Sequence, residues 1–192
     1  MNTRNVLLGA GALLLLFGAR SARAAAPSAP SAGGTDEAAR RAFVAELDAA
    51  IRRIAGGYSR AARIMIIAQA AFESGWGKTR MYREGFNPFN IIRSSSDLGQ
   101  VIVSGDQECK PDGTCRPITQ RFAKYGSLDE AVGAYLRLLA GARYKDALTK
   151  LEHGDVEGFV TTLYAGGYFT LPVAKYLMSF REMIRSVERR LA

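Results

Sequence analysis

The chain has 192 residues, of which 48% are hydrophobic and 23% charged, values that suit one globular domain with a sizeable core and exclude a disordered or repetitive protein. The net charge of +8 includes three arginines among the first 24 residues, so the rest of the chain carries 8 − 3 = +5, without a polybasic block. Nucleic acid is therefore not an expected partner, whereas an anionic extracellular polymer is, because long-range attraction raises encounter rates.

The first 34 residues are expected to lie outside the folded domain. Arg4 precedes an apolar stretch over residues 6–19, and Ala22-Arg23-Ala24 follows it, which is typical of a secretory signal peptide over residues 1–24. The stretch has 14 residues, whereas a helix needs about 20 to cross a bilayer, so we expect cleavage and no stable membrane insertion. Residues 25–34 have the composition of a flexible linker. The sequence therefore predicts an exported protein of the periplasm or cell envelope, with one domain over residues 35–192.

Two helices are predicted at the start of this domain. Apolar residues recur at helical spacing between residues 35 and 55, which indicates an amphipathic helix. These residues are Phe43, Leu47, Ile51 and Ile54. A second helix begins after Ser59, a suitable N-cap. Residues 64–72 are apolar on nearly every face, which predicts a helix buried on all sides; Gly75 and Gly77 end it.

A small β lobe is expected between residues 91 and 126. A short helix over residues 78–84 and a turn-rich segment over residues 85–90 precede it. The β lobe contains two runs of β-forming residues, 101–103 and 118–122, and two candidate turns, 104–106 and 111–113. This pattern predicts a hairpin.

The only cysteines, Cys109 and Cys115, flank the second of these turns. Thiols of an exported chain oxidise, so a local disulfide is predicted at the hairpin tip, where closing a short loop contributes roughly 2 kcal/mol. The spacing fits no common zinc motif. The only histidine, His153, lies in a polar loop and is expected to be a solvated turn residue. No metal or other cofactor is expected.

The second half of the domain is predicted to be helical. Ser127 and Glu130 form a capping box, and apolar residues follow on one helical face, namely Val132, Tyr135, Leu138 and Leu139. Further helices fit residues 144–151 and 155–165, and a basic amphipathic helix runs to Arg190 after a break at 166–172. The predicted fold class is α+β, mainly helical with a small β-hairpin lobe.

One carboxylate, Glu73, stands at the end of the apolar helix, close to Phe72 and Trp76. The negative end of the helix dipole and the apolar surroundings both raise the pKa of a glutamate. A shift of ~2 units corresponds to ~2.7 kcal/mol, enough to keep the acid largely protonated near neutral pH, as a general acid for a glycosidic bond requires. The alternative is a solvent-exposed glutamate at a frayed helix end without a chemical role. Ser74 and Thr170 lack a histidine partner, which excludes a Ser-His hydrolase.

Residues 68–77, Ala-Gln-Ala-Ala-Phe-Glu-Ser-Gly-Trp-Gly, resemble the signature AQAALESGWG of the peptidoglycan β-N-acetylglucosaminidases of glycoside hydrolase family 73, the type found in flagellar-rod muramidases and autolysins. Residues 87–91 are similar to the family's Asn-Leu-Phe-Gly/Asn-Ile segment, and residues 121–127 resemble its Phe-Arg-x-Tyr-x-Ser element. Arg143-Tyr144 and Gly167-Tyr168 resemble two further family elements. The resemblance covers roughly residues 40–190.

The resemblance implies a lysozyme-like fold in which the saccharide lies in a groove between a helical lobe and the β lobe. It implies that Glu73 is the general acid, which protonates the leaving oxygen of an N-acetylglucosaminyl linkage. Three possibilities stay open for the second catalytic group: Glu108, Asp106 or the substrate's own 2-acetamido group. The cysteine pair in this region departs from the family's pattern.

The resemblance also implies a catalytic role for Tyr168, whose family counterpart lies in the groove near the acetamido group; the alternative is a core tyrosine. Leu171 stands where the family usually has aspartate, so polar support for this loop is missing. Phe89, Asn90 and Trp76 are the substrate-binding candidates. We expect Phe89 to be an exposed aromatic in the groove, and core packing is the alternative for Trp76.

We therefore expect an exported endo-β-N-acetylglucosaminidase that acts on peptidoglycan glycan strands and needs no cofactor. The alternative enzyme is a lytic transglycosylase on a similar scaffold, which closes a ring within the product instead of using water. The alternative from another class is a catalytically silent peptidoglycan-binding module, because function belongs to the site and not to the fold.

Overall fold

The computed structural model describes residues 33–93, 99–109 and 114–192. The predicted signal peptide, most of the predicted linker and the predicted turn at 111–113 lie outside these residues. The first helix begins at Gly33, two residues before the predicted start of the domain.

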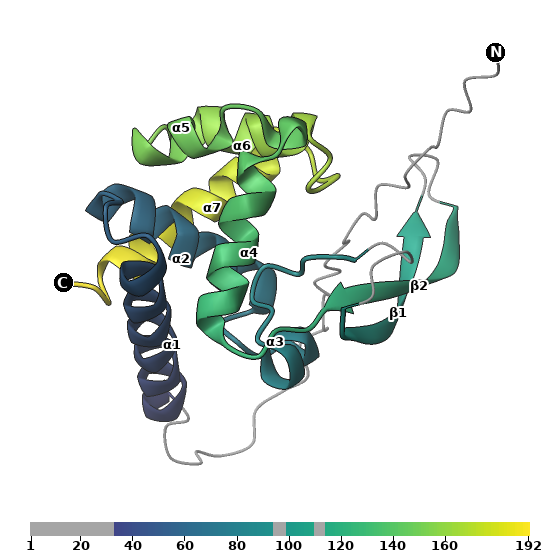
Figure 1. Cartoon of the computed structure of the whole chain (residues 1–192), viewed down its shortest axis with the longest axis horizontal. Helices are drawn as coiled ribbons and strands as arrows, with labels where there is room; N and C mark the ends of the chain where they lie inside the picture. The colour runs from purple at the N-terminus through teal and green to yellow at the C-terminus, as the bar shows by residue number, and fades with distance from the viewer. Residues whose placement is uncertain (1–32, 94–98, 110–113) are drawn as a thin grey trace, which may run out of the picture.

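The described residues form a helical lobe from which a β-hairpin projects to one side (Figure 1). The helices are α1 (Gly33–Ile54), α2 (Arg60–Ser74), α3 (Arg80–Gly85), α4 (Leu128–Ala140), α5 (Ala147–Glu152), α6 (Val156–Ala165) and α7 (Val173–Glu188), with a 3-10 turn over Ala142–Tyr144. The hairpin consists of β1 (Val101–Cys109) and β2 (Cys115–Ala123). The predicted mainly helical α+β architecture is confirmed.

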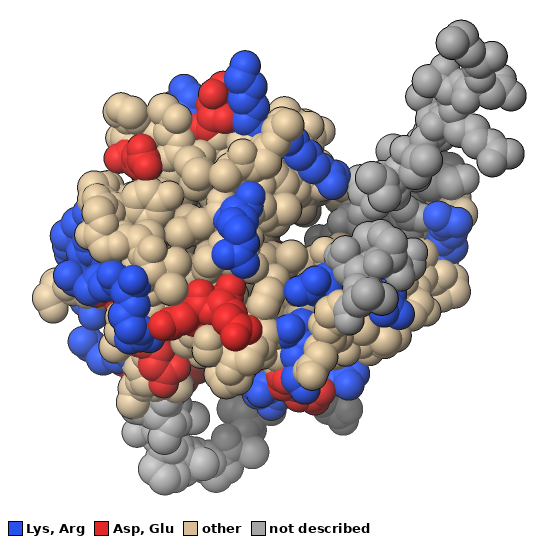
Figure 2. All heavy atoms as spheres, in the orientation of Figure 1, with Lys and Arg blue, Asp and Glu red and all other residues tan. Residues whose placement is uncertain are grey.

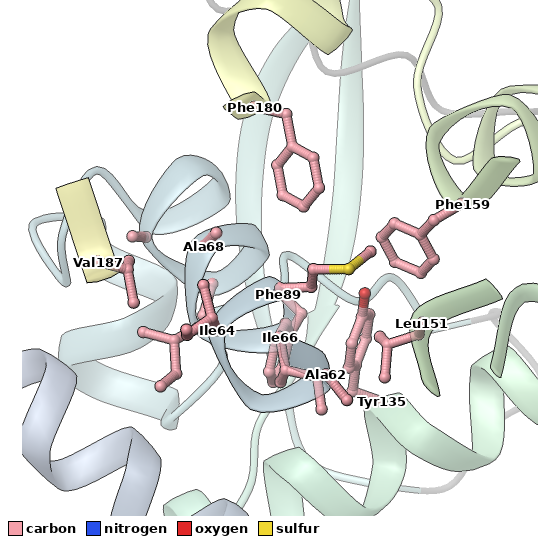
Figure 3. Close-up of a cluster of buried hydrophobic side chains, with 14 of the residues drawn as sticks. Ala62, Ile64, Ile66, Ala68, Phe89, Tyr135, Leu151, Phe159, Phe180 and Val187 are labelled. Carbon is pink, nitrogen blue, oxygen red and sulfur yellow. The ribbon is translucent and has the colours of Figure 1, made fainter. Parts of the chain in front are cut away.

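Helix α2 is the centre of the helical lobe, and its predicted burial on all sides is confirmed. Its buried residues run from Ala62 to Ser74, interrupted by Arg63 and Phe72. Ser59 caps the helix by accepting a hydrogen bond from Ala62 N at 3.1 Å. Figure 3 shows Ile64, Ile66 and Ala68 of α2 among core side chains from other elements, including Phe89, Tyr135, Leu151, Phe159, Phe180 and Val187.

The predicted core face of α1 is correct except at its end. Phe43, Leu47 and Ile51 are buried, whereas Ile54 is 45% exposed. Ile54 is the last residue of α1, where the helix runs past the edge of the core. The side chain lies at the surface beside Gly133 of α4.

The capping box at the start of α4 is confirmed, with a shift of one residue in the return bond. Ser127 accepts from Glu130 N at 3.2 Å, and the Glu130 carboxylate accepts from Gly126 N at 2.9 Å. The single helix predicted over 144–151 is wrong. Asp146 has a positive φ of 71°, which interrupts the helix, so Tyr144 ends the 3-10 turn and α5 begins at Ala147.

The predicted hairpin is confirmed, and its strands are longer than predicted. Residues 104–106 do not form a turn; they continue β1 and pair with residues 118–120 of β2. Cys109 and Cys115 are cross-strand partners in this register. The side chains of both lie outside the described residues, so the disulfide stays a prediction.

His153 is exposed at the end of α5, where Nδ1 contacts Thr149 O at 2.7 Å, as expected of a turn residue. Within the described ranges, no group of three or more His, Cys, Asp or Glu side chains is arranged to hold a metal ion. No helix in this part of the chain has the length and apolar character needed to span a membrane.

Candidate active site

Glu73 lies in the last turn of α2 and is only 6% exposed. The alternative of a solvent-exposed glutamate at a frayed helix end is therefore wrong. The helix ends in three successive residues with left-handed backbone conformation, Gly75, Trp76 and Gly77, with φ of 57°, 62° and 77°. This conformation is strained for a residue with a side chain, and it reverses the chain immediately after Glu73.

One carboxylate oxygen of Glu73, Oε1, faces two buried hydrogen-bond donors. Gln69 Nε2 donates to it at 3.1 Å, and the Tyr176 hydroxyl lies 3.2 Å away. Gln69 and Tyr176 also contact each other, with Nε2 donating to the hydroxyl at 2.8 Å. The ring of Tyr176 stacks on Phe169, with centroids 3.7 Å apart, and meets the edge of Phe72. These contacts fix the position of Oε1.

Among the described residues, the other oxygen, Oε2, has only a long contact. Asn90 Nδ2 donates to the backbone carbonyl of Glu73 at 2.8 Å and lies 3.4 Å from Oε2. Asn90 has a positive φ of 50°, a conformation that asparagine tolerates better than most residues. This conformation places its amide against the end of α2. The predicted site residue Asn90 therefore does lie beside Glu73.

Burial raises the pKa of Glu73 from its ordinary value of 4.5 to about 7, while the hydrogen bonds from Tyr176 and Asn90 act in the opposite direction. Burial prevails because withdrawing water disfavours the charged form more than two donors favour it. The direction predicted from the sequence is confirmed. Near neutral pH, a large fraction of this carboxyl group carries a proton that it can donate.

Tyr168 joins the loop before α7 to the turn that carries Asn90. Its hydroxyl donates to Phe89 O at 2.7 Å, and its ring meets the edges of Tyr135 and Tyr144. The side chain is half-buried. The ring thus packs on the core, as in the core-tyrosine alternative, while the hydroxyl holds the turn beside the site; a catalytic role for Tyr168 stays a prediction.

The prediction that Phe89 is an exposed aromatic is wrong. Its ring is fully buried and stacks on Tyr135, with centroids 4.0 Å apart and ring planes within 2° of parallel. The ring has no free face for a sugar. The polar turn residues around Phe89 favour a loop at the surface, whereas the aromatic side chain of Phe89 anchors that loop to Tyr135 of α4.

Trp76 packs between positively charged side chains. The guanidinium groups of Arg40 and Arg190 lie 5.3 Å and 4.9 Å from its ring centroid, and Phe43 meets its edge at 6.2 Å. Arg190 also pairs with Glu37 of α1. The geometry favours the packing role for Trp76, in which it ties the end of α2 to α1 and to the end of the chain.

The two candidates for the second catalytic carboxylate, Glu108 and Asp106, are placed by their backbone alone. Glu108 and Asp106 belong to β1, where their backbone partners are Arg116 and Ile118. Their side chains lie outside the described residues, so a role for either stays a prediction.

Two residues that hold Glu73 were not among the predicted site residues. Gln69 had a signal, because it is the one strongly polar residue in the apolar part of α2 and lies one helical turn before Glu73. Tyr176 lies 103 positions away in the sequence and had none.

A family model described as "Glucosaminidase: Mannosyl-glycoprotein endo-beta-N-acetylglucosaminidase" matches residues 49–189. The peptidoglycan hydrolase FlgJ of Salmonella typhimurium is 29% identical over 146 residues, which cover 73% of this chain and 45% of that protein. The chain thus spans less than half the length of this curated relative.

Two solved structures show the same fold. A peptidoglycan hydrolase mutant from Sphingomonas sp. A1 superposes with a TM-score of 0.65 at 27% identity, over 79% of this chain and 97% of that one. The catalytic domain of the autolysin Auto from Listeria monocytogenes superposes with a TM-score of 0.62 at 18% identity, over 85% of this chain and 97% of that one. At that identity the second match concerns the fold alone.

Proposed function

This chain belongs to the Glucosaminidase family, and we propose that it hydrolyses N-acetylglucosaminyl linkages in peptidoglycan glycan strands, with Glu73 as the general acid. The observation that carries the proposal is the buried carboxyl group at the end of α2, whose pKa is about 7. The name of the Salmonella relative supports peptidoglycan as the substrate.

The hydrogen bonds around Glu73 indicate which of its oxygens donates the proton. Oε1 accepts from Gln69 and faces the Tyr176 hydroxyl, so it acts as the carbonyl-like oxygen of the protonated acid. The proton is then carried by Oε2, for which the described residues provide only the long contact to Asn90. From Oε2 it passes to the glycosidic oxygen as the bond breaks and positive charge develops on the sugar ring.

The second group is proposed to be Glu108, with Asp106 and the substrate's acetamido group as the alternatives. A carboxylate would act through water or directly on the sugar, whereas the acetamido group would stabilise the ring cation from within the substrate. Glu108→Gln and Asp106→Asn separate these cases, because only the loss of a required carboxylate lowers turnover strongly. Full activity of both variants supports acetamido participation.

The decisive experiment is turnover of purified glycan strands by the parent, Glu73→Gln and the control Glu182→Gln, which changes an exposed carboxylate in α7. Loss of the general acid should lower turnover by about 10²–10⁴-fold, and the control should keep full activity. New reducing N-acetylglucosamine ends in the product support hydrolysis, and anhydro-muramic products would instead establish a lytic transglycosylase. If the parent bound the strands without releasing sugar ends, the chain would be a binding module.

We further propose that the protein acts in the cell envelope after export through the predicted signal peptide, with a disulfide between Cys109 and Cys115. Directly opposite residues of an antiparallel pair have Cα atoms about 4.5–5.5 Å apart, within the range that a disulfide spans. Labelling the exported protein with a thiol reagent before and after reduction tests the bond. Labelling without reduction would refute it.

A further inference from the structure

Two arginines lie directly opposite one another on neighbouring segments of the β lobe. Residue 92 pairs with Phe122 in an isolated antiparallel bridge, and Arg93 N donates to Arg121 O at 2.8 Å. One step beyond the bridge, antiparallel geometry therefore sets Arg93 opposite Arg121, with Cβ atoms about 5 Å apart and both side chains on one face. Val103 of β1 continues this row, because it is the partner of Arg121.

The two positive charges have no counter-charge in the described part of the chain. Both side chains are half-buried, and the Nε of each is enclosed without a hydrogen-bond partner. By contrast, Arg53 and Arg63 each pair with an aspartate. Like charges directly opposite each other on a sheet are destabilising, and enclosed polar groups without partners add to that cost. Two neighbouring guanidinium groups without such a partner among the described residues suit an anionic ligand.

The face of the β lobe that carries the arginine pair contacts the hydrophobic core near Ile91 and is open to solvent at Val103, which is 49% exposed. Ile91 is two residues before Arg93 and shares its face, and it packs against both hydrophobic clusters of the core. The opposite face meets α3, where a Cβ on Gly85 would come within 2.7 Å of Ile102. Lysine and arginine side chains gather over α3 and the hairpin (Figure 2), so the field in this region favours an anion.

The pair is also within reach of a strand bound at the proton donor. Asn90, which contacts Glu73, precedes Arg93 by three residues, about 10 Å of extended chain. The guanidinium of Arg93 rests against Gly99, where a Cβ would come within 2.7 Å of its Cζ. Any other residue at position 99 would push this group aside.

We propose that Arg93 and Arg121 form a subsite for a carboxylate of the peptide that a peptidoglycan strand bears, a proposal that rests on the proposed function. Guanidinium groups bind carboxylates through paired, charge-assisted hydrogen bonds. A polymer of N-acetylglucosamine alone carries no carboxylate, whereas the peptides of peptidoglycan do. The subsite thus makes the protein select peptide-bearing strands over neutral strands of the same sugar.

Binding measurements in the Glu73→Gln background, where turnover is suppressed, test the subsite. The probes are a soluble peptide-bearing glycan fragment and the neutral N-acetylglucosamine hexamer, each with Arg93→Gln, Arg121→Gln and the control Arg83→Gln. Arg83 is an exposed arginine of α3, which contacts both strands of the hairpin, so its loss removes the same charge next to the β lobe. We expect each subsite variant to bind the peptide-bearing fragment about tenfold more weakly, the loss of one charge-assisted contact, and the hexamer as before.

A purely structural role for the pair makes different predictions. The free Arg121→Gln protein should melt at the same temperature as its parent or higher, because a like-charge contact is removed, and the peptide-bearing fragment should raise the melting temperature of the parent more than that of the variant. Equal weakening for both probes, an equal effect of Arg83→Gln, or protection by inorganic phosphate as strong as by the fragment would overturn the proposal.

The outcome also separates this inference from the proposed function. Arginine variants of the active chain that cleave peptide-bearing strands at the parent rate would refute the subsite alone. A parent that cleaves no strand, but binds the peptide-bearing fragment in an arginine-dependent way, would refute the hydrolase and keep the subsite.

Discussion

Replacing Glu73 by glutamine should stabilise the protein at alkaline pH and not at acidic pH. Burial holds the pKa of Glu73 at about 7 in the folded chain, against 4.5 when the group is in water. Below pH 4.5 both the folded and the unfolded carboxyl groups are protonated, so the raised pKa has no effect on stability. Between pH 4.5 and 7 the folded form keeps a proton that the unfolded form releases, so stability falls as the pH rises. Above pH 7 the folded protein has lost the full amount of stability that the raised pKa of Glu73 costs.

The size of this loss of stability follows from the difference between the pKa values of Glu73 in the folded and unfolded chain. A difference of 2.5 units at 1.36 kcal/mol per unit gives about 3 kcal/mol. Glutamine is neutral at every pH, and its oxygen can take the place of Oε1 opposite Gln69 and Tyr176. Its amide would then face the Asn90 donor across the present 3.4 Å contact, which lowers the gain, so we expect 2–3 kcal/mol, or about 4–12 °C in melting temperature.

The assay is urea unfolding of the parent, Glu73→Gln and Glu182→Gln at pH 4 and pH 8. Carboxylates with lowered pKa, such as Asp36 and Asp129, affect all three proteins alike, so the difference between parent and variant isolates Glu73. We expect a gain at pH 8 only for Glu73→Gln. Equal stability of this variant and the parent at both pH values would refute the conclusion that Glu73 is held protonated by burial.

The remaining predictions concern the groups around Glu73. Tyr176→Phe removes a donor that lowers the pKa of Glu73, so the alkaline limb of the pH–activity profile should move to higher pH, by up to about one unit; a move to lower pH would contradict this assignment. Gly75→Ala and Gly77→Ala both strain a positive φ, but only at Gly77 would the new Cβ come within 3.0 Å of neighbouring aromatic rings. The free energy of unfolding should therefore fall by about 1 kcal/mol in Gly75→Ala and by about 3 kcal/mol in Gly77→Ala. Equal losses in the two variants would count against the local packing. Tyr168→Phe removes the hydrogen bond to Phe89 O and should lower stability by about 1 kcal/mol and turnover at least tenfold, because that bond fixes the turn beside Glu73; a stable and fully active variant would exclude this role.

The elements were largely predictable from the sequence, because their signals are local. The apolar run of α2, the Ser59 cap and the Gly75 stop predicted a buried helix with Glu73 in its last turn, and the structure confirms each of them. The errors arose where two local signals competed. Ser104-Gly105-Asp106 has turn composition but lies in β1, because its pairing with β2 outweighs local preference.

The direction of the Glu73 pKa shift was also accessible from the sequence, since an acid after nine apolar or neutral residues loses water wherever the helix packs. Its partners were not. Tyr176 and Asn90 reach Glu73 from distant or reversed segments of chain, and Phe89 turned inward to stack on Tyr135. The sequence by itself determined which helix carries the acid and where that helix stops, because capping and periodicity act within a few residues. Only the tertiary structure decided which donors hold the acid and which aromatic rings face solvent, because these depend on the packing of segments that sequence order does not bring together.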